Sequence, residues 1–154
     1  MEKSSTMSLP ALRQPRINNQ LDQNTTSFVE PQNYLIVTLK DGKKLVVSSD
    51  SYHGIFKDVE LYRCVFCETE MVRDMITKEQ HKSSENHKKI LETYPHVEEF
   101  KENLIRKLDG VNHYCTVCNV VVTSLFLHKH IITEAHVKEL QMAVARACAY
   151  KPSN

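Results

Sequence analysis

The chain has little of the material that enzymes use to hold cofactors or to activate nucleophiles. Its 154 residues include only three glycines, which are too few for most cofactor-binding loops. No nucleophile elbow, phosphate-cradling glycine loop or HExxH pattern occurs in the sequence. The acidic residues are spread along the chain as solvated charge. We therefore expect a protein that is not an enzyme.

Long apolar runs are also missing. The longest, residues 34–39 and 120–122, fall far short of the roughly 20 residues that a membrane-crossing helix needs. The first residues show neither the apolar core nor the small-residue cleavage pattern of a secretory signal. We therefore expect an intracellular protein without a membrane partner. In a reducing compartment, its five cysteines are more typical of metal binding or redox chemistry than of disulfides.

The chain also lacks an excess of charge of one sign, because its formal net charge is only +1. Residues 60–94 carry six positive side chains against seven acids, and residues 111–141 carry two lysines balanced by two glutamates. A nucleic-acid binder is expected to gather lysine and arginine on one face. The sequence offers no broad basic field of this kind.

What the chain does contain is a repeated pattern of cysteine and histidine. In each copy two residues separate the cysteines and five separate the histidines, giving Cys64, Cys67, His81 and His87, then Cys115, Cys118, His130 and His136. The segment between the second cysteine and the first histidine has thirteen residues in one copy and eleven in the other. The cysteines are therefore offset by 51 residues and the histidines by 49, which indicates an internal repeat.

Two cysteines and two histidines at this spacing are typical of a zinc site. Zinc accepts a tetrahedron of thiolate and imidazole ligands, and four protein ligands leave no open position for water or substrate. Each copy spans only about thirty residues, too few to fold on apolar burial alone. We therefore predict two structural zinc ions that drive folding.

Other cysteines and histidines compete for these roles. His128 is an alternative to His130, but it leaves only nine residues after Cys118 and seven before His136, so His130 is preferred. His113 is expected to be an exposed or packing residue because the tetrahedron is already full. Cys148 has no partner at ligand spacing and is expected to be a small buried hydrophobe. His53 and His96 carry no signal.

The histidine spacing predicts a broken helix. Residues six apart on a straight helix differ by about 600° of turn, so they lie about 120° away from one common face. The helix must therefore loosen or kink between the two histidines. Residues 83–86 in the first copy and Thr133 in the second have side chains that compete for backbone hydrogen bonds, which favours a break there.

The pattern resembles the matrin-type zinc finger, also called the double-stranded-RNA-binding or small-nuclear-ribonucleoprotein-like type. The resemblance rests on C-x2-C with H-x5-H, on HKSSENHKK in the first copy, and on HYCTVCNV and AHVKEL in the second. It covers residues 62–90 and 113–140, and both connecting segments depart from the family's usual length. It implies a ββα fold for each finger, a nuclear location, and binding of duplex RNA or DNA or protein contacts in ribonucleoprotein and chromatin assemblies.

Two functions therefore stay open. The first is binding of structured RNA or DNA, for which Lys78, Lys82, Lys88 and Lys89 form a candidate stripe along the first finger's helix; a plain solvated helix face is the alternative. The second is a protein-interaction adaptor within a nuclear RNA or chromatin complex. The run LFLHKHII presents more apolar side chains than one small finger can bury, which indicates packing on another segment or on a partner. The resemblance favours the first function, and the charge balance slightly favours the second.

The segments around the fingers carry their own patterns. Residues 1–32 are polar with no hydrophobic period and are predicted to be disordered. Two β-rich runs joined by an Asp-Gly turn then predict a β-hairpin. The hairpin is expected to pack on the first finger or a partner through Tyr52, Ile55 and Phe56.

Between the fingers, apolar residues at helical spacing run from Pro95 to a stop at Gly110 and predict an amphipathic linker helix. Its apolar stripe is expected to dock on a finger, with a partner as the alternative. After His136 the helical period continues to about Tyr150. The sequence thus predicts a small α+β fold with a disordered segment, a β-hairpin segment, finger 1, a linker helix, and finger 2 with an extended C-terminal helix, at residues 1–32, 33–60, 61–94, 95–110 and 111–150.

Overall fold

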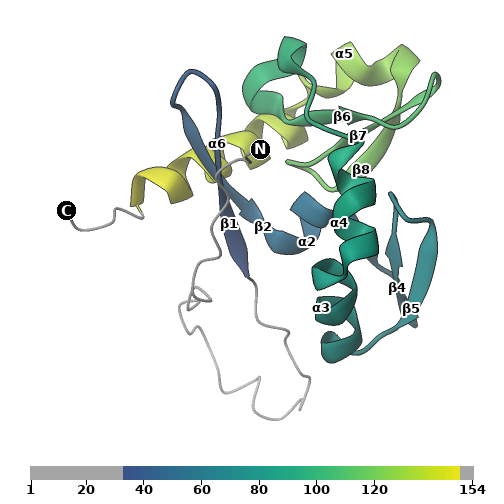
Figure 1. The fold of residues 1–154 in the computed structure, drawn as a ribbon. Helices are drawn as coiled ribbons and strands as arrows, with labels where there is room; N and C mark the ends of the chain where they lie inside the picture. Colours follow the sequence, from purple (N-terminus) through teal and green to yellow (C-terminus); the bar gives the residue numbers. More distant parts are fainter. Residues whose placement is uncertain (1–32, 150–154) are drawn as a thin grey trace.

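The computed structural model describes residues 33–149, so the segment predicted to be disordered lies outside the described part (Figure 1). The chain begins there with a β-hairpin of β1 (Tyr34–Thr38) and β2 (Lys44–Ser48), paired antiparallel with Leu35 opposite Val47. The predicted hairpin is confirmed. Its turn contains Gly42 at φ 92°, a left-handed conformation that glycine adopts without steric cost.

Two similar units follow the hairpin. Each has a short helical turn, a three-stranded antiparallel sheet and a helix in two pieces. The first unit consists of α2 (Ser49–His53), β3 (Ile55–Lys57), β4 (Leu61–Cys64), β5 (Thr69–Val72), α3 (Met75–Ser83) and α4 (Glu85–Glu92). The second consists of η1 (Glu98–Asn103), β6 (Ile105–Lys107), β7 (Asn112–Cys115), β8 (Val120–Thr123), η2 (Ser124–Phe126), α5 (Leu127–His130) and α6 (Glu134–Ala149).

The expected small α+β class is confirmed, but each unit has one strand more than the expected ββα finger. The added strands, β3 and β6, pair with the strands that carry the first cysteines, placing Ile55 opposite Cys64 and Ile105 opposite Cys115. Within residues 33–149, no helix is both long enough and apolar enough to cross a membrane.

The predicted linker helix over residues 95–110 is wrong. The segment forms the short 3-10 turn η1, in which Lys101 has φ 43°, and then the strand β6. The apolar residues of this segment pack into two different cores, so they do not form the single apolar stripe of an amphipathic helix. Leu104 packs against the hairpin, whereas its neighbour Ile105 packs in the core of the second unit, and both are fully buried. Leu104 caps the end of η1 in a left-handed conformation (φ 51°, ψ 64°) and the extended strand β6 begins at Ile105, so the two adjacent side chains leave the chain on different sides.

The hairpin packs mainly against the C-terminal helix rather than against the first finger. Val37, Leu45 and Val47 form a core with Leu104 and with Ala143 of α6, and α6 crosses the hairpin in Figure 1. Of the three residues expected to make the hairpin's contact, Tyr52 borders this core, whereas Ile55 and Phe56 belong to the core of the first unit. The predicted extension of the last helix is confirmed as far as Ala149, the last described residue.

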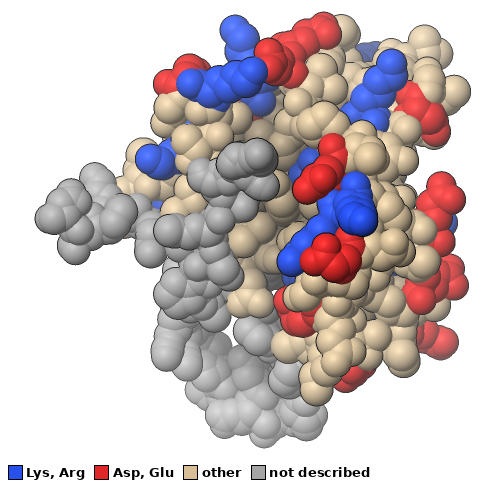
Figure 2. Space-filling view, viewed as in Figure 1, with Lys and Arg blue, Asp and Glu red and all other residues tan. Residues whose placement is uncertain are grey.

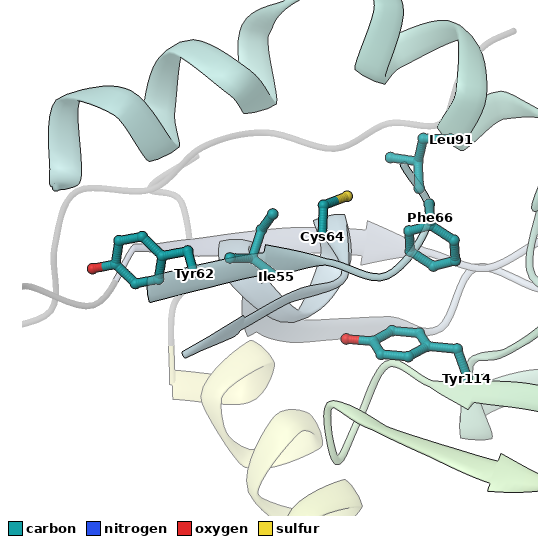
Figure 3. Packing of buried hydrophobic residues seen from close by; sticks show 6 residues of the cluster. All are labelled: Ile55, Tyr62, Cys64, Phe66, Leu91 and Tyr114. Atoms are coloured by element: carbon teal, nitrogen blue, oxygen red, sulfur yellow. The ribbon is translucent and has the colours of Figure 1, made fainter. Parts of the chain in front are cut away.

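A shared core joins the two units. Tyr114 of β7 is fully buried among first-unit residues, and its ring meets that of Phe66 edge-on at 5.3 Å between centroids (Figure 3). The Tyr114 hydroxyl donates to the Ser51 carbonyl at 2.9 Å. The buried Arg106 of β6 donates to the carbonyls of Tyr94 at 2.6 Å and Tyr52 at 3.1 Å. The units are thus one packed body rather than two fingers on a linker.

Candidate metal centres

The first cluster is built where the sheet of the first unit meets its broken helix. Cys64 ends β4, Cys67 lies in the turn that follows, His81 lies in α3 and His87 in α4. One donor atom from each of the four side chains lies within 4.8 Å of every other. The turn is tight because Glu68, directly after Cys67, adopts a left-handed φ of 56°. This geometry aims both sulfur atoms at one point.

The second cluster repeats the arrangement. Cys115 ends β7, Cys118 lies in the next turn, His130 ends α5 and His136 lies in α6, with the same 4.8 Å limit between donor atoms. Asn119, at φ 57°, takes the place of Glu68. The structure therefore brings together all eight side chains that the spacing singled out, in two groups that can each hold a metal ion.

The predicted breaks between the paired histidines are confirmed. Ser84 separates α3 from α4 with an extended ψ of 149°, and its hydroxyl accepts a hydrogen bond from the His87 amide at 3.1 Å. In the second unit, Thr133 lies between α5 and α6, and its hydroxyl accepts from the His136 amide at 3.2 Å. Each hydroxyl caps the helix that carries the last histidine. The break turns that histidine towards the cysteines.

Two nitrogen atoms indicate where a cation belongs. Among the described residues, Nε2 of His81 and Nε2 of His130 are buried without a hydrogen-bond partner. A buried polar atom without a partner costs free energy, and such atoms are rare in native proteins. Both histidine atoms belong to the clusters, so a bound metal ion would satisfy them, whereas a third such atom, Nε of Arg106, lies outside the clusters. The last histidine of each cluster faces the sulfur atoms with Nδ1. His87 Nδ1 lies 3.4 Å from Cys67 Sγ, and His136 Nδ1 lies 3.5 Å from Cys118 Sγ.

The remaining nitrogen of each last histidine has a partner that the sequence analysis missed. His87 Nε2 lies 3.0 Å from Nδ1 of His53, a residue for which the sequence pattern predicted no role. His136 Nε2 lies 2.7 Å from Asn103 Oδ1. The two partners are 50 residues apart in the chain, close to the offsets of the ligands themselves. The cysteine offset of 51 aligns His53 with Leu104 rather than with Asn103, so extending the repeat upstream does not pair the two residues.

The competing histidines and the last cysteine lie outside both clusters. His128 packs its ring against Phe100, with centroids 5.5 Å apart. His113 shares a hydrogen bond with Ser124, and the half-buried His96 shares one with Thr116. Cys148 is exposed on α6. The prediction that it is a buried hydrophobe is therefore wrong, because the apolar face of this helix passes through Ala143 instead.

The predicted lysine stripe is wrong for two of its four members. Lys78 and Lys82 are only 4% and 5% exposed, and their ammonium groups lie 2.9 and 2.8 Å from the two carboxylate oxygens of Asp50. Lys82 also donates to the Ser49 hydroxyl at 3.0 Å. These two lysines hold α3 against α2 and are turned away from solvent. Lys88 and Lys89, on α4, are exposed.

The chain matches no known protein-family model, no curated protein and no solved structure.

Proposed function

We propose that each cluster holds one structural zinc ion. Zinc bonds of about 2.3 Å to sulfur and about 2.0 Å to nitrogen place the two kinds of ligand about 3.6 Å apart in a tetrahedron. The sulfur-to-Nδ1 distances are 3.4 and 3.7 Å for His87, and 3.5 Å to both sulfur atoms for His136. Two thiolates and two imidazoles suit zinc, and four protein ligands leave no position for a substrate. The proposed sites are therefore structural and the chain is not an enzyme.

Zinc affinity is expected to rise with pH. Burial, and then the neighbouring Cys64, raise the pKa of the Cys67 thiol to about 12, so this thiol is protonated at neutral pH when no cation is bound. The pKa of Cys118 is also raised, by its hydrogen bond with Cys115 and by burial. The metal binds thiolate, so each site must release at least one thiol proton when it binds zinc. The apparent zinc affinity should therefore rise at least about tenfold per pH unit. Competition titrations with a chromophoric chelator at pH 6.5 to 8.5 measure this slope, and a flat profile would contradict thiolate ligation.

We further propose that the zinc-bound body is a protein-interaction module. The observation that carries this proposal is the set of exposed apolar side chains within residues 125–132, here called the apolar surface of the second unit: Leu125, Phe126 and Ile132 are 85%, 58% and 73% exposed. Large apolar side chains gathered on a surface mark sites that bind other proteins. Charge gives no competing signal, because residues 33–149 hold sixteen basic and sixteen acidic side chains. Figure 2 shows both signs interspersed on the face it presents.

Nucleic-acid binding is the second candidate, and one observation favours it. Lys88 and Lys89 are exposed and directly follow His87, the last ligand of the first cluster. The resemblance to the matrin-type finger supports a nuclear setting, in ribonucleoprotein or chromatin complexes, for either candidate. With Lys78 and Lys82 paired to Asp50, however, the first unit retains only two lysines of the four that the nucleic-acid proposal used.

The experiment compares two double variants at equal zinc content. Leu125→Asp with Phe126→Asp alters the apolar surface, and Lys88→Glu with Lys89→Glu alters the basic pair; both pairs are exposed, so both variants should fold. Quantitative affinity purification from nuclear extract should lose its specific partners only with the first variant. Salt-dependent titration with duplex RNA and DNA should give only non-specific affinity, weaker than about 1 μM. Tighter, steeply salt-dependent binding that the lysine variant abolishes would replace this proposal with the nucleic-acid one.

A further inference from the structure

The repeated unit of this chain begins upstream of the cysteines. His53 ends α2 and Asn103 ends η1, and in each unit a single residue separates this position from the next strand, β3 or β6. The next residue in each unit, Gly54 or Leu104, has a left-handed φ of 71° or 51°. Two residues that differ in chemistry therefore occupy one structural position, 50 residues apart.

The same hydrogen bonds fix this position in both units. The Gly54 carbonyl accepts from the Val65 amide at 2.9 Å, and the Leu104 carbonyl accepts from the Thr116 amide at 3.0 Å. Val65 and Thr116 each directly follow the first cysteine of their cluster. The side chain one residue before this carbonyl is thereby held beside the last histidine of the same cluster. Gly54 is tightly enclosed, since an added Cβ would lie 2.3 Å from the Phe66 ring.

From this geometry we propose that His53 and Asn103 are positioning residues that hold the last histidine of each cluster so that Nδ1 faces the metal. The proposal rests on the proposed metal binding and adds the rule that selects the ligating nitrogen. A metal-bound imidazole keeps its proton on the other nitrogen, which then needs an acceptor. In both units the acceptor comes from this one position.

The second unit gives the more complete evidence for the direction of the hydrogen bond. Asn103 donates through Nδ2 to the Phe100 carbonyl at 3.0 Å, so its Oδ1 is the atom that faces His136. An amide oxygen can only accept, which means that Nε2 of His136 carries the proton. Nδ1 of the same ring is then unprotonated, and it lies 3.5 Å from the sulfur atoms of Cys115 and Cys118. This tautomer is the one that a metal ion at the cluster requires.

The first unit reaches the same result with a different side chain. His53 Nδ1 lies 3.0 Å from Nε2 of the fully buried His87, and in the proposed arrangement it accepts a hydrogen bond from the proton on that nitrogen. The His53 ring is itself packed edge-on against Tyr52, with centroids 5.4 Å apart. Without an acceptor at this position, the His87 N–H would be buried and unpaired. The ring would then lose the contact that selects its tautomer.

The test removes and exchanges the two acceptors. Asn103→Leu removes the acceptor from the second cluster at similar volume, and His53→Leu removes it from the first. His53→Asn and Asn103→His exchange the side chains between the units and keep an acceptor in place. His96→Leu is the control, because it also deletes the side-chain hydrogen bond of a histidine, but that histidine is half-buried and faces Thr116 rather than a ligand. Zinc affinity is measured site by site with a competing chelator. Long-range nitrogen–proton NMR spectra of the zinc-loaded protein identify the ligating nitrogen of His87 and His136.

We expect Nδ1 ligation at both histidines in the unaltered protein. Each leucine variant should lose about 10- to 100-fold in zinc affinity at its own site, with the other site unchanged. The exchange variants should stay within about threefold of the unaltered protein, and the control should lose thermal stability without a change of ligating nitrogen. Nε2 ligation in the unaltered protein, or unchanged affinity in both leucine variants, would overturn the proposal. If the unaltered protein binds no zinc, the proposed function itself fails, and that outcome differs from intact zinc binding with the wrong nitrogen.

Discussion

Removal of zinc by a chelator is expected to unfold both units in a single transition. Structural zinc contributes about 10 kcal/mol or more to folding in comparable peptides, which is as large as the whole stability of a typical domain. The clusters sit at the junction of sheet and helix in each unit, and Tyr114 and Arg106 bury side chains of one unit in the other. Loss of one site therefore removes the surface on which the other unit packs.

Cysteine substitutions give this prediction a matched control. Cys115→Ser should abolish the cooperative thermal transition seen by circular dichroism and release one of two zinc equivalents, or both. Cys148→Ser changes the exposed cysteine outside both clusters and should leave zinc content and stability within about 0.5 kcal/mol of the unaltered protein. A chelated protein that kept protected backbone amides in both units would refute the zinc-dependent fold.

Asp50→Asn is expected to destabilise the protein by about 3–5 kcal/mol, because it removes the carboxylate charge that the buried ammonium groups of Lys78 and Lys82 share. Lys78 and Lys82 each direct their ammonium group at one oxygen of this single carboxylate. Burial raises the pKa of Asp50, but the ion pairs with Lys82 and Lys78 outweigh this effect and lower it overall. The contribution is therefore present above the ordinary carboxyl pKa and is lost as the pH falls through the lowered value. Urea denaturation at neutral pH with zinc in excess measures the loss.

The control for Asp50 is Glu79→Gln. Glu79 also pairs with Lys82, at 3.1 Å, but it pairs with only this one lysine and its side chain is 44% exposed, against 33% for Asp50, so its removal should cost less than about 1 kcal/mol. A second variant tests the cause directly. Asp50→Leu combined with Lys78→Met and Lys82→Met should recover most of the stability, because apolar groups of similar size can replace a buried ion pair. Equal losses from Asp50→Asn and Glu79→Gln would show that the buried ion pairs carry no special weight.

The features that local chemistry determines could be predicted from the sequence. Ligand spacing singled out the eight side chains that converge, and it required a helix break that Ser84 and Thr133 provide. The Asp-Gly turn located the hairpin. In each case the signal lay within a few residues, where turn geometry and helical period act.

The features that long-range packing determines could not be predicted in this way. The apolar residues around Leu104 fit a helical period, yet the helical turn ends at Leu104 and a strand that pairs with β7 begins at Ile105, because the two residues pack in separate cores. Lys82 resembled a solvated helix residue because its partner Asp50 lies 32 positions away. His53 gave no signal for the same reason, since its partner His87 is 34 positions away. Hydrophobic periodicity shows which face of a helix or strand is apolar, but it does not show which distant segment packs on that face.

The packing of Tyr114 and Arg106 between the units also decides how this molecule meets a ligand. Two fingers on a flexible tether adjust their separation, and they gain affinity through a high effective concentration of the second finger. Here the contacts of Arg106 with Tyr52 and Tyr94 fix one relative orientation, so no tether entropy is lost when both units are engaged. A ligand of the right shape therefore meets a preorganised footprint. A ligand of another shape cannot engage both units at once, because the contacts between the units prevent them from changing their relative orientation.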